Sequence, residues 1–281
     1  MMKFILIISM LFAFTCTQAS LIALYEFEEP EPSDAPGAVI DRVAGNNGST
    51  VMGAGVTQGV AGKFGNAYQF TAGGVDLGSD PAVQPTDGFT ITMWINSITL
   101  RAFDRYLESQ STNANGQHGI RLDSGASGDR FRALIRSGNA GGNTQHTHST
   151  TLMANAWYFA ATRYNSASSG LQLTVLADAG STTAGTVAGA TQTAAVLNTG
   201  ALNTPHARST LLGLEVPTGN TNNMRGFMDD VAFFDHVLTD QELADTFNNG
   251  AAFFLIPEPS SATLLLLGFT LFTRARMRVQ A

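Results

Sequence analysis

The chain has 281 residues, of which 44% are hydrophobic and only 13% are charged, against about 25% charged residues in a typical soluble domain. Its 29 glycines and scarce charges argue against a helical bundle or coiled coil, and its net charge of −7 offers no basic surface for nucleic acid. The plentiful, patterned apolar residues argue against intrinsic disorder. The composition therefore predicts a turn-rich, mostly β protein.

Residues 1–19 have the organisation of a signal peptide. Lys3 precedes an apolar run over residues 4–14, and a short polar stretch follows. Thr17 and Ala19 fit the small-residue cleavage site, so we expect signal peptidase to cut after Ala19. This organisation predicts that the protein is exported.

Cys16 is the single cysteine of the chain and lies inside this segment. A lipoprotein signal is the alternative interpretation, but Phe14 and Thr15 are poor residues for the motif that precedes a lipid-modified cysteine. Cleavage after Ala19 leaves a mature protein without cysteine, so we expect no disulfide even in an oxidising compartment.

The middle of the chain alternates short apolar segments with turn-rich clusters at intervals of about ten residues, which is typical of an all-β sandwich. Residues 53–65 are predicted as a run of β-turns, and residues 180–200 as a loop rich in small residues. The predicted strands are 21–27, 67–71, 74–77, 89–94, 105–109, 119–122, 130–136, 157–164, 171–176, 211–214 and 227–234.

One short helix is predicted at the end of this region. Thr239 and Glu242 have the spacing of a capping box, and Leu238 and Leu243 flank it as a hydrophobic staple. Gly250 is the natural stop. We therefore expect a two-turn helix that closes the domain.

Residues 257–281 combine three parts in a fixed order. These are Pro257-Glu258-Pro259, an uncharged stretch over 260–273, and the cluster Arg274, Arg276 and Arg278. A helix over 259–273 would span about 22 Å, short of the ~30 Å hydrocarbon core, and the arginines would extend its reach by snorkelling.

This order of parts resembles a PEP-CTERM sorting signal. The resemblance implies a short transmembrane helix over about 260–273, which holds the exported protein at the inner membrane until an exosortase processes it. The arginines alternate with Ala275 and Met277, which departs from the adjacent arginines of the pattern. An ordinary tail anchor is the alternative. The residues assigned to the signal are Pro257, Glu258, Pro259, Arg274 and Arg276.

Without both ends, the body comprises residues 20–256, a length that fits one large sandwich better than two domains. It loses four basic residues and one acidic residue, so its net charge falls from −7 to −10. We therefore expect a soluble, acidic domain that avoids anionic surfaces and accommodates cations.

Eight segments of the body resemble, in order, a LamG-like domain of the concanavalin A-like jelly-roll superfamily. They are 25–27, 41–49, 62–70, 89–95, 156–165, 226–234, 238–242 and 247–250. The resemblance implies an all-β, antiparallel jelly-roll β-sandwich of the concanavalin A-like lectin/glucanase type over 20–256, with one short C-terminal helix. The sequence departs from the pattern at 175–180, where such domains usually have a compact Asp-Gly turn.

The resemblance also implies a structural calcium ion, because related jelly rolls hold one with carboxylate and carbonyl oxygens. The implied ligands are Asp41, in the loop after the first strand, and Asp229, in the penultimate strand. The alternative is that Asp41 caps a turn and that Asp229 pairs with an arginine or a backbone donor.

Glycosidases also occur in this superfamily, and they need two carboxylates directed into one cleft, about 5–5.5 Å apart for a retaining reaction. The nearest pattern is Glu26-Phe27-Glu28, on a predicted edge strand. Asp229 and Asp230 are adjacent and are expected to point to opposite faces of their strand. We therefore predict no catalytic residues and no enzymatic activity.

His146 and His148 share a strand face, but no Asp, Glu or Cys lies near them at the spacing of a zinc site. A solvated loop or sheet edge is the better interpretation. Trp94 and Trp157 lie in apolar strand segments, so we expect both to pack in the core rather than to stack on sugars.

The sequence therefore predicts an exported, non-catalytic module that passes the inner membrane and ends at the cell surface or outside the cell. Its expected partner is a polysaccharide or a surface protein, without nucleic acid, and its ligand-binding residues are not identified. A secreted glycan-processing enzyme that uses the concave sheet face is the second hypothesis. A structural matrix component without a specific ligand is the third.

Overall fold

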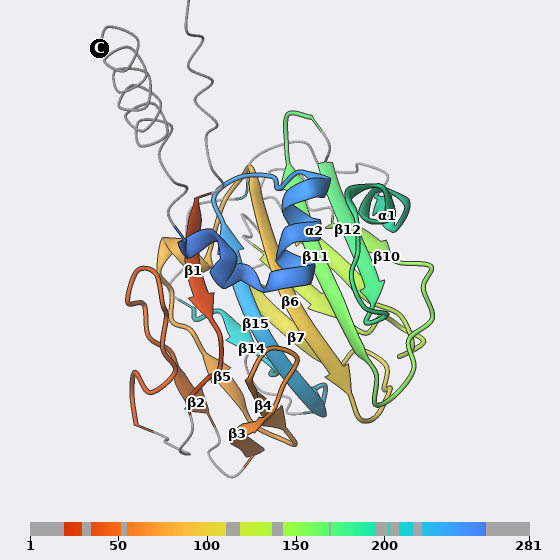
Figure 1. Cartoon of the computed structure of the whole chain (residues 1–281). Helices are drawn as coiled ribbons and strands as arrows, with labels where there is room; N and C mark the ends of the chain where they lie inside the picture. Colours follow the sequence, from red (N-terminus) through yellow and green to blue (C-terminus); the bar gives the residue numbers. More distant parts are fainter. Residues whose placement is uncertain are drawn as a thin grey trace, which may run out of the picture.

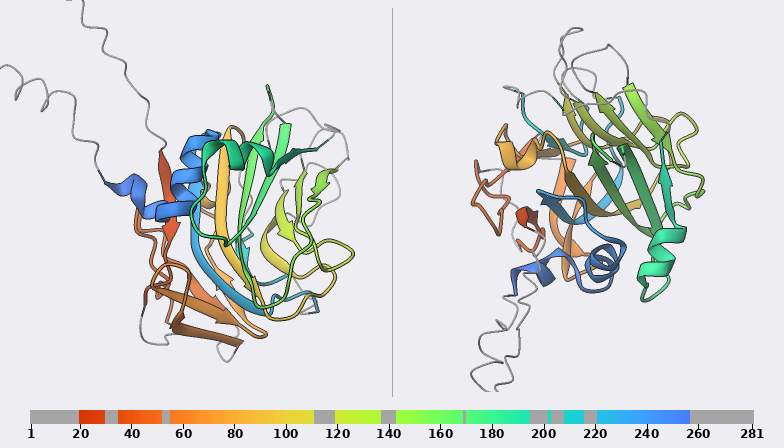
Figure 2. Two further views of the ribbon diagram at one scale, coloured as in Figure 1. Left: turned by 45° about the vertical axis from the view of Figure 1, so that its right-hand side comes forward. Right: turned by 90° about the horizontal axis from the view of Figure 1, so that it is seen from above.

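The computed structural model describes residues 20–29, 35–51, 55–110, 119–136, 143–168, 170–194, 202, 208–215 and 221–256. The predicted signal peptide and sorting signal lie outside these residues. Two antiparallel sheets pack face to face as a sandwich (Figure 1, Figure 2), which confirms the predicted all-β class. In the described part of the chain, no helix is both long and apolar enough to cross a membrane.

Sheet 1 has eight strands. They are β1 (Leu21–Tyr25), β3 (Val56–Ala61), β4 (Asn66–Phe70), β6 (Phe89–Ser97), β11 (Trp157–Asn165), β12 (Gly170–Ala177), β13 (Thr191–Thr193) and β15 (Gly226–Phe234). The order is β13-β12-β11-β6-β15-β4-β3, and β1 also pairs with β15. The strand β15 thus pairs with β6 on one side, and with β4 and then β1 on the other.

Sheet 2 has seven strands in the order β10-β9-β8-β7-β14-β5-β2. They are β2 (Ser49–Val51), β5 (Gly74–Asp76), β7 (Arg105–Gln110), β8 (Gly119–Asp123), β9 (Arg132–Arg136), β10 (Asn143–Thr147) and β14 (Leu211–Leu212).

The core lies between the inner faces of the two sheets. Strand alternation separates the faces: in β6, Ile91, Met93 and Ile95 point into this core, whereas Trp94 points outward. Full burial of one large apolar side chain contributes about 1.5–3 kcal/mol, so this core provides most of the stabilisation. The largest side chains within it include Tyr25, Tyr68, Phe70, Phe89, Phe131 and Phe233.

A second apolar layer covers part of the outer face of sheet 1. It contains α1 (Ala184–Gly189), α2 (Asp240–Asn249) and the 3-10 turn η3 (Ala251–Leu255), and Figure 1 shows α2 and η3 lying across the sheet. Trp94 is fully buried in this layer, with its ring centroid 4.8 Å from that of Phe247 and 5.5 Å from that of Phe159. The prediction that Trp94 packs in a core is therefore confirmed.

The predicted capping box is present at the start of α2. The Thr239 hydroxyl accepts the Glu242 N–H, and the Glu242 carboxylate accepts the Thr239 N–H at 2.7 Å. Leu238 and Leu243 are both fully buried, as a hydrophobic staple requires. Gly250 ends the helix with a φ of 78°, a conformation that favours glycine.

The elements that the sequence predictions miss are short or rich in glycine. The strand β3 lies inside 53–65, which is predicted as turns, but Val56 and Gln58 are buried on alternate positions and the strand pairs with β4. The helix α1 and the strand β13 lie inside 180–200, and β2 and β10 are likewise unpredicted. These segments have weak hydrophobic patterns of their own in the sequence. They are stabilised by pairing with neighbouring elements, which the sequence pattern does not reveal.

We expect Thr239→Ala to lower the free energy of unfolding by about 1 kcal/mol, because it removes the side-chain acceptor for the Glu242 N–H. Thr239→Ser keeps a hydroxyl at this position and should retain most of the stability. Urea unfolding of the two variants beside the unsubstituted protein measures the difference. Equal losses in both variants would contradict a capping role.

Candidate functional site

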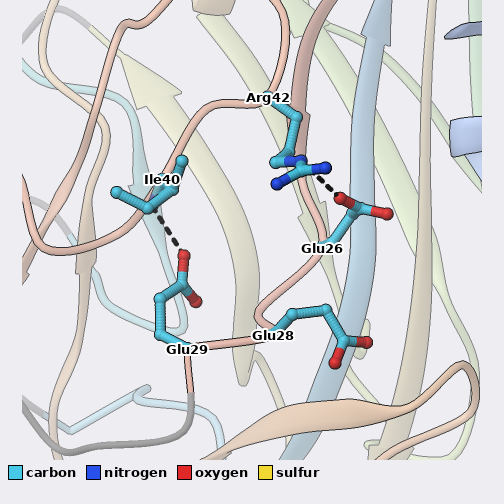
Figure 3. A pocket seen from close by; sticks show the side chains of 5 residues that line it. All are labelled: Glu26, Glu28, Glu29, Ile40 and Arg42. Carbon is cyan, nitrogen blue, oxygen red and sulfur yellow. Dashed lines mark hydrogen bonds and ion pairs between the residues drawn. The ribbon is translucent and has the colours of Figure 1, made fainter.

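A surface pocket of about 170 Å³ lies beside the end of β1 (Figure 3). Glu26, Glu28 and Glu29 line it from one segment, and Ile40 and Arg42 line it from the loop that runs alongside β1. Three acidic side chains and one guanidinium group thus line the same pocket. The pocket offers hydrogen-bond acceptors to a hydroxylated or cationic group.

Phe27 breaks the strand alternation between these glutamates. Its φ of 59° lies in the left-handed region, and its ring is buried on Tyr68, with the centroids 4.4 Å apart. Because the backbone turns at this residue, Glu26 and Glu28 do not form the regular same-face pair that a continuous strand would give.

The pocket carboxylates are held in different ways. Glu26 forms an ion pair with Arg42 at 2.9 Å, and Glu29 accepts the Ile40 N–H at 2.8 Å, both seen in Figure 3. Burial raises the pKa of Glu26 above its ordinary value, Arg42 opposes this shift, and the charges of Glu28 and Glu29 add to it.

A second group of charges lies on the outer face of sheet 2, around Asp123. The Asp123 side chain is fully buried, and it forms ion pairs with Arg105 at 3.2 Å, Arg121 at 2.8 Å and Arg132 at 2.7 Å. Its other oxygen accepts the Gly125 N–H at 2.8 Å and the Arg132 Nε–H at 2.9 Å. Both oxygens of Asp123 are therefore occupied by donors from the protein.

Glu108 lies on the same face of the neighbouring strand and bonds to the Nε of Arg105 at 3.1 Å. Arg105 therefore contacts both Glu108 and Asp123, and its remaining nitrogen pairs with Glu215 at 3.1 Å. The enzyme hypothesis requires two carboxylates that reach a substrate from one face. These two carboxylates are instead buried against guanidinium groups, as in a structural ion-pair network.

Asp41, a predicted calcium ligand, holds its own loop against β1. Its carboxylate accepts the N–H groups of Leu24, Val43, Ala44 and Asn46 at 3.0–3.2 Å. The bond to Leu24 occupies a backbone donor on the free side of β1, where an exposed strand edge would otherwise remain. In this arrangement the carboxylate faces N–H donors and does not fit a cation.

Asp229, the other predicted calcium ligand, lies at a bulge in the middle of β15. Its Oδ2 accepts the N–H groups of Lys63 and Phe64, both at 2.8 Å. The next residue, Asp230, has a φ of 50° and accepts the Ala251 N–H at 2.8 Å. The predicted orientation to opposite faces is therefore wrong, because the bulge inserts one residue and both carboxylates contact segments that flank the outer layer.

Burial governs the protonation of this aspartate pair. It raises the pKa of Asp229 to about 8, an effect that the N–H bonds oppose and the charge of Asp230 reinforces. It raises the pKa of Asp230 to about 7, again against the N–H bond from Ala251.

The structure does not bring Asp41 and Asp229 together as one ligand set. Asp41 bonds to its own loop and β1, and Asp229 to the turn before β4. No group of three His, Cys, Asp or Glu side chains with metal-site geometry occurs among the described residues. Calcium binding stays a prediction, and melting curves with and without a calcium chelator test it.

His146 of β10 and His148, just after this strand, join the edges of the sheets. His146 Nε2 lies 3.0 Å from the Gln192 side-chain oxygen, and His148 Nε2 lies 2.9 Å from the Ala190 carbonyl oxygen. His148 is buried, and its Nδ1 accepts the Thr150 N–H, so Nε2 carries the proton in the neutral ring. The predicted sheet edge is confirmed, but His148 is not solvated.

The sequence predictions miss the ion-pair network around Asp123. They identify Glu26 and Glu28 only as two nearby carboxylates on a predicted edge strand, without a pocket. Arg121 and Asp123 have the period of one strand face, which is the local signal for the network. Their partners come from separate strands, so the cluster emerges only when the pairing of β7, β8 and β9 is known. The sorting-signal residues lie outside the described part of the chain.

We expect the protein to lose stability as the pH rises from about 5 to about 9. The folded-state pKa values of Asp229 and Asp230 lie above the ordinary value near ~4, so the folded chain retains protons that the unfolded chain releases. Their stabilising contribution is complete at acidic pH and is lost as the pH rises through about 7 to 8.

Asp229→Asn replaces this acid by a neutral group of the same shape whose oxygen still accepts the two N–H groups. We expect the loss of unfolding free energy between about pH 5 and pH 9 to shrink by at least about 1.4 kcal/mol, the equivalent of one pKa unit. Asp235→Asn, at an exposed position, is the control and should change little. An unchanged pH dependence in Asp229→Asn would refute the assignment.

Comparison with solved structures shows the same fold in three other proteins. Domain 4 of an extracellular arabinanase from Geobacillus stearothermophilus, solved with arabinotriose, matches at a TM-score of 0.58 and 15% identity, covering 81% of this chain and 98% of that one. A botulinum neurotoxin C/D receptor-binding domain matches at 0.54 and 12% identity, covering 81% and 50%. Trypanosoma rangeli sialidase with sialic acid matches at 0.51 and 13% identity, covering 80% and 32%.

No curated protein matches the sequence. A family model described as the concanavalin A-like lectin/glucanases superfamily, Laminin_G_3, matches residues 70–244, which is more than half of the chain. The fold includes both lectin-like binding domains and glycosidases. The match and the two-sheet architecture agree with the resemblance seen in the sequence, and the chain therefore belongs to the concanavalin A-like lectin/glucanase superfamily.

Proposed function

We propose that this protein is an exported, non-catalytic recognition module whose β-sandwich binds polysaccharide at the cell surface or in the extracellular matrix. The observation that carries the proposal is the placement of the carboxylates. Those on the sheet faces, such as Asp123 and Asp229, are buried and bonded to donors of the protein. Those that line the surface pocket, Glu26, Glu28 and Glu29, also bond to donors of the protein, but they are half-buried or exposed and so remain accessible to a ligand.

The buried carboxylates support the non-catalytic part of the proposal. A glycosidase needs one carboxyl group as proton donor and another as base or nucleophile, both in contact with the sugar. Asp123 has no oxygen left for a substrate, and Glu108 bonds to Arg105. A secreted glycan-processing enzyme remains the alternative, and hydrolysis of a bound glycan would establish it.

Carbohydrate as the ligand is supported by the structural neighbours. The arabinanase domain, of which the match covers 98%, was solved with arabinotriose, and this supports a sugar ligand. The sialidase was solved with sialic acid, and the match covers 32% of that chain. The acidic pocket agrees with such a ligand, since carboxylates accept hydrogen bonds from sugar hydroxyl groups.

Export and sorting complete the proposal. The segment 1–19 is proposed to direct export through signal peptidase, and the segment 257–281 to hold the protein at the inner membrane until an exosortase releases or anchors it. The order of Pro257-Glu258-Pro259, apolar stretch and arginines supports this part.

We expect the body 20–256 to be retained on at least one polysaccharide of a glycan array. Glu26→Gln, Glu28→Gln and Glu29→Gln combined remove three charges at nearly constant size, and should weaken retention about tenfold if the pocket binds the sugar. Asp235→Asn with Asp245→Asn is a charge control away from the pocket. Failure of every polysaccharide to retain the protein would favour the purely structural role.

Replacement of Pro257-Glu258-Pro259 by alanines should leave the full-length protein unprocessed in the membrane fraction of the producing cell. A sorting enzyme that reads this motif would no longer recognise the tail, whereas the apolar stretch would still partition into lipid. Immunoblots of membrane and medium fractions measure the outcome. Normal processing of the variant would indicate a plain tail anchor.

A further inference from the structure

Five uncharged side chains form a row across neighbouring strands on the outer face of sheet 1. In order across the sheet, with one residue each from β11, β6, β15, β4 and β3, they are Trp157, Asn96, Phe227, Gln69 and Thr57. Residues opposite each other in paired strands share a face. The row therefore alternates aromatic rings with amides and ends on a hydroxyl.

Full burial in the outer apolar layer ends one step before this row, and Trp157 packs against the edge of the layer. Trp94 and Phe159, two positions along β6 and β11, are fully buried, whereas Trp157, Asn96 and Phe227 are only half-buried. In Figure 1, α2 and η3 cross the upper part of the sheet, and the lower ends of β6 and β15 carry no helix. Trp157 packs against the edge of this layer and is half-buried, so the prediction that it packs in the core is confirmed only in part.

The two aromatic rings lean toward each other above Asn96. Their strands lie two steps apart, about 9.6 Å, yet the ring centroids of Trp157 and Phe227 are 6.4 Å apart. The Oδ1 of Asn96 is buried at this point and has no hydrogen-bond donor among the residues that the structure describes. This oxygen has almost no exposed surface, so a hydroxyl group of a ligand would bond to it only after the two half-buried rings move apart.

The row carries no charge although the body of the protein is strongly acidic. Lys63 and Asp178 lie beside the row and form an ion pair of 2.7 Å, and the Lys63 Nζ lies 4.8 Å from the centroid of Trp94. Arg225, just before β15, is a further exposed charge at this end of the strand. The charges of Lys63 and Asp178 compensate each other beside the row. A neutral surface of this kind is complementary to a neutral ligand.

We propose that this row binds a neutral polysaccharide chain that lies across the strands of sheet 1. The C–H faces of pyranose rings pack on Trp157 and Phe227, and the hydroxyl groups at their edges bond to the amides of Asn96 and Gln69. This inference rests on the proposed carbohydrate function and names a surface that shares no residue with the glutamate pocket.

The test measures retention of the full-length chain, kept in a detergent without a sugar headgroup, on a neutral β-glucan, on mannan and on the acidic polysaccharide alginate. Trp157→Ala and Phe227→Ala should each weaken binding to a neutral glycan about tenfold, as truncation of a central aromatic contact does. Phe253→Ala is the matched control, because Phe253 is 39% exposed on η3 and lies outside the row. Its binding should be unchanged.

A second measurement needs no substitution that endangers folding. The chain has only two tryptophans, and Trp94 is fully buried, so a fluorescence change on glycan addition reports on Trp157. We expect a neutral glycan to shift the emission of the unsubstituted protein and to protect it from acrylamide quenching. Absence of both effects at saturating glycan would overturn the proposal.

The other outcomes are distinguishable. One outcome is that the glutamate triple variant loses retention while Trp157→Ala and Phe227→Ala bind normally. This result would place the sugar in the pocket. It would overturn binding at the row and sustain the proposed function. Preference for alginate over both neutral glycans would overturn the proposal that the ligand is a neutral polysaccharide. No retention of any polysaccharide by any form of the protein would overturn the row and the carbohydrate function together.

Discussion

The bulge of β15 is the constraint on which the arrangement of sheet 1 and its cover depends. This strand pairs with β6 on one side and with β4 and β1 on the other, so a change in its register would displace three neighbours. At the bulge, Asp229 binds the turn before β4 and Asp230 binds the start of η3. Two buried carboxylates are costly, and the protein retains them where they join a sheet, a hairpin and the outer layer.

Charge in this protein is mainly structural wherever it is buried. Asp41 secures a loop to the free side of β1, and Asp123 joins three arginines on sheet 2. Such networks contribute little net stability compared with apolar packing, but removal of one member leaves an unpaired buried charge. The two proposed ligand surfaces, the acidic pocket and the neutral row, differ in charge, chemistry and supporting elements.

Local patterns predicted much of the fold, and pairing between distant strands accounts for most of what they missed. The helix α2 follows from Thr239 and Glu242 alone, and the two-sheet class follows from short alternating segments. The bulge at Asp230, the exposure of Trp157 and the cluster around Asp123 depend on which strands meet and on what covers them. Trp94 and Trp157 lie in similar apolar segments of the sequence. Trp94 is covered by a helix and is fully buried, whereas Trp157 lies beyond the helix and is half-buried.

The two ends of the sandwich leave it at the same place. The carbonyl of Ser20 accepts the Asp235 N–H just beyond β15, and η3 packs beside β1, as Figure 1 shows. The aromatic row lies at the opposite end of β15, about 23 Å away for the seven residue-to-residue steps from Phe227 to Phe234. The long axis of this strand therefore acts as a spacer: a domain tethered through its last turn would hold the row at a fixed stand-off from the surface to which it is attached.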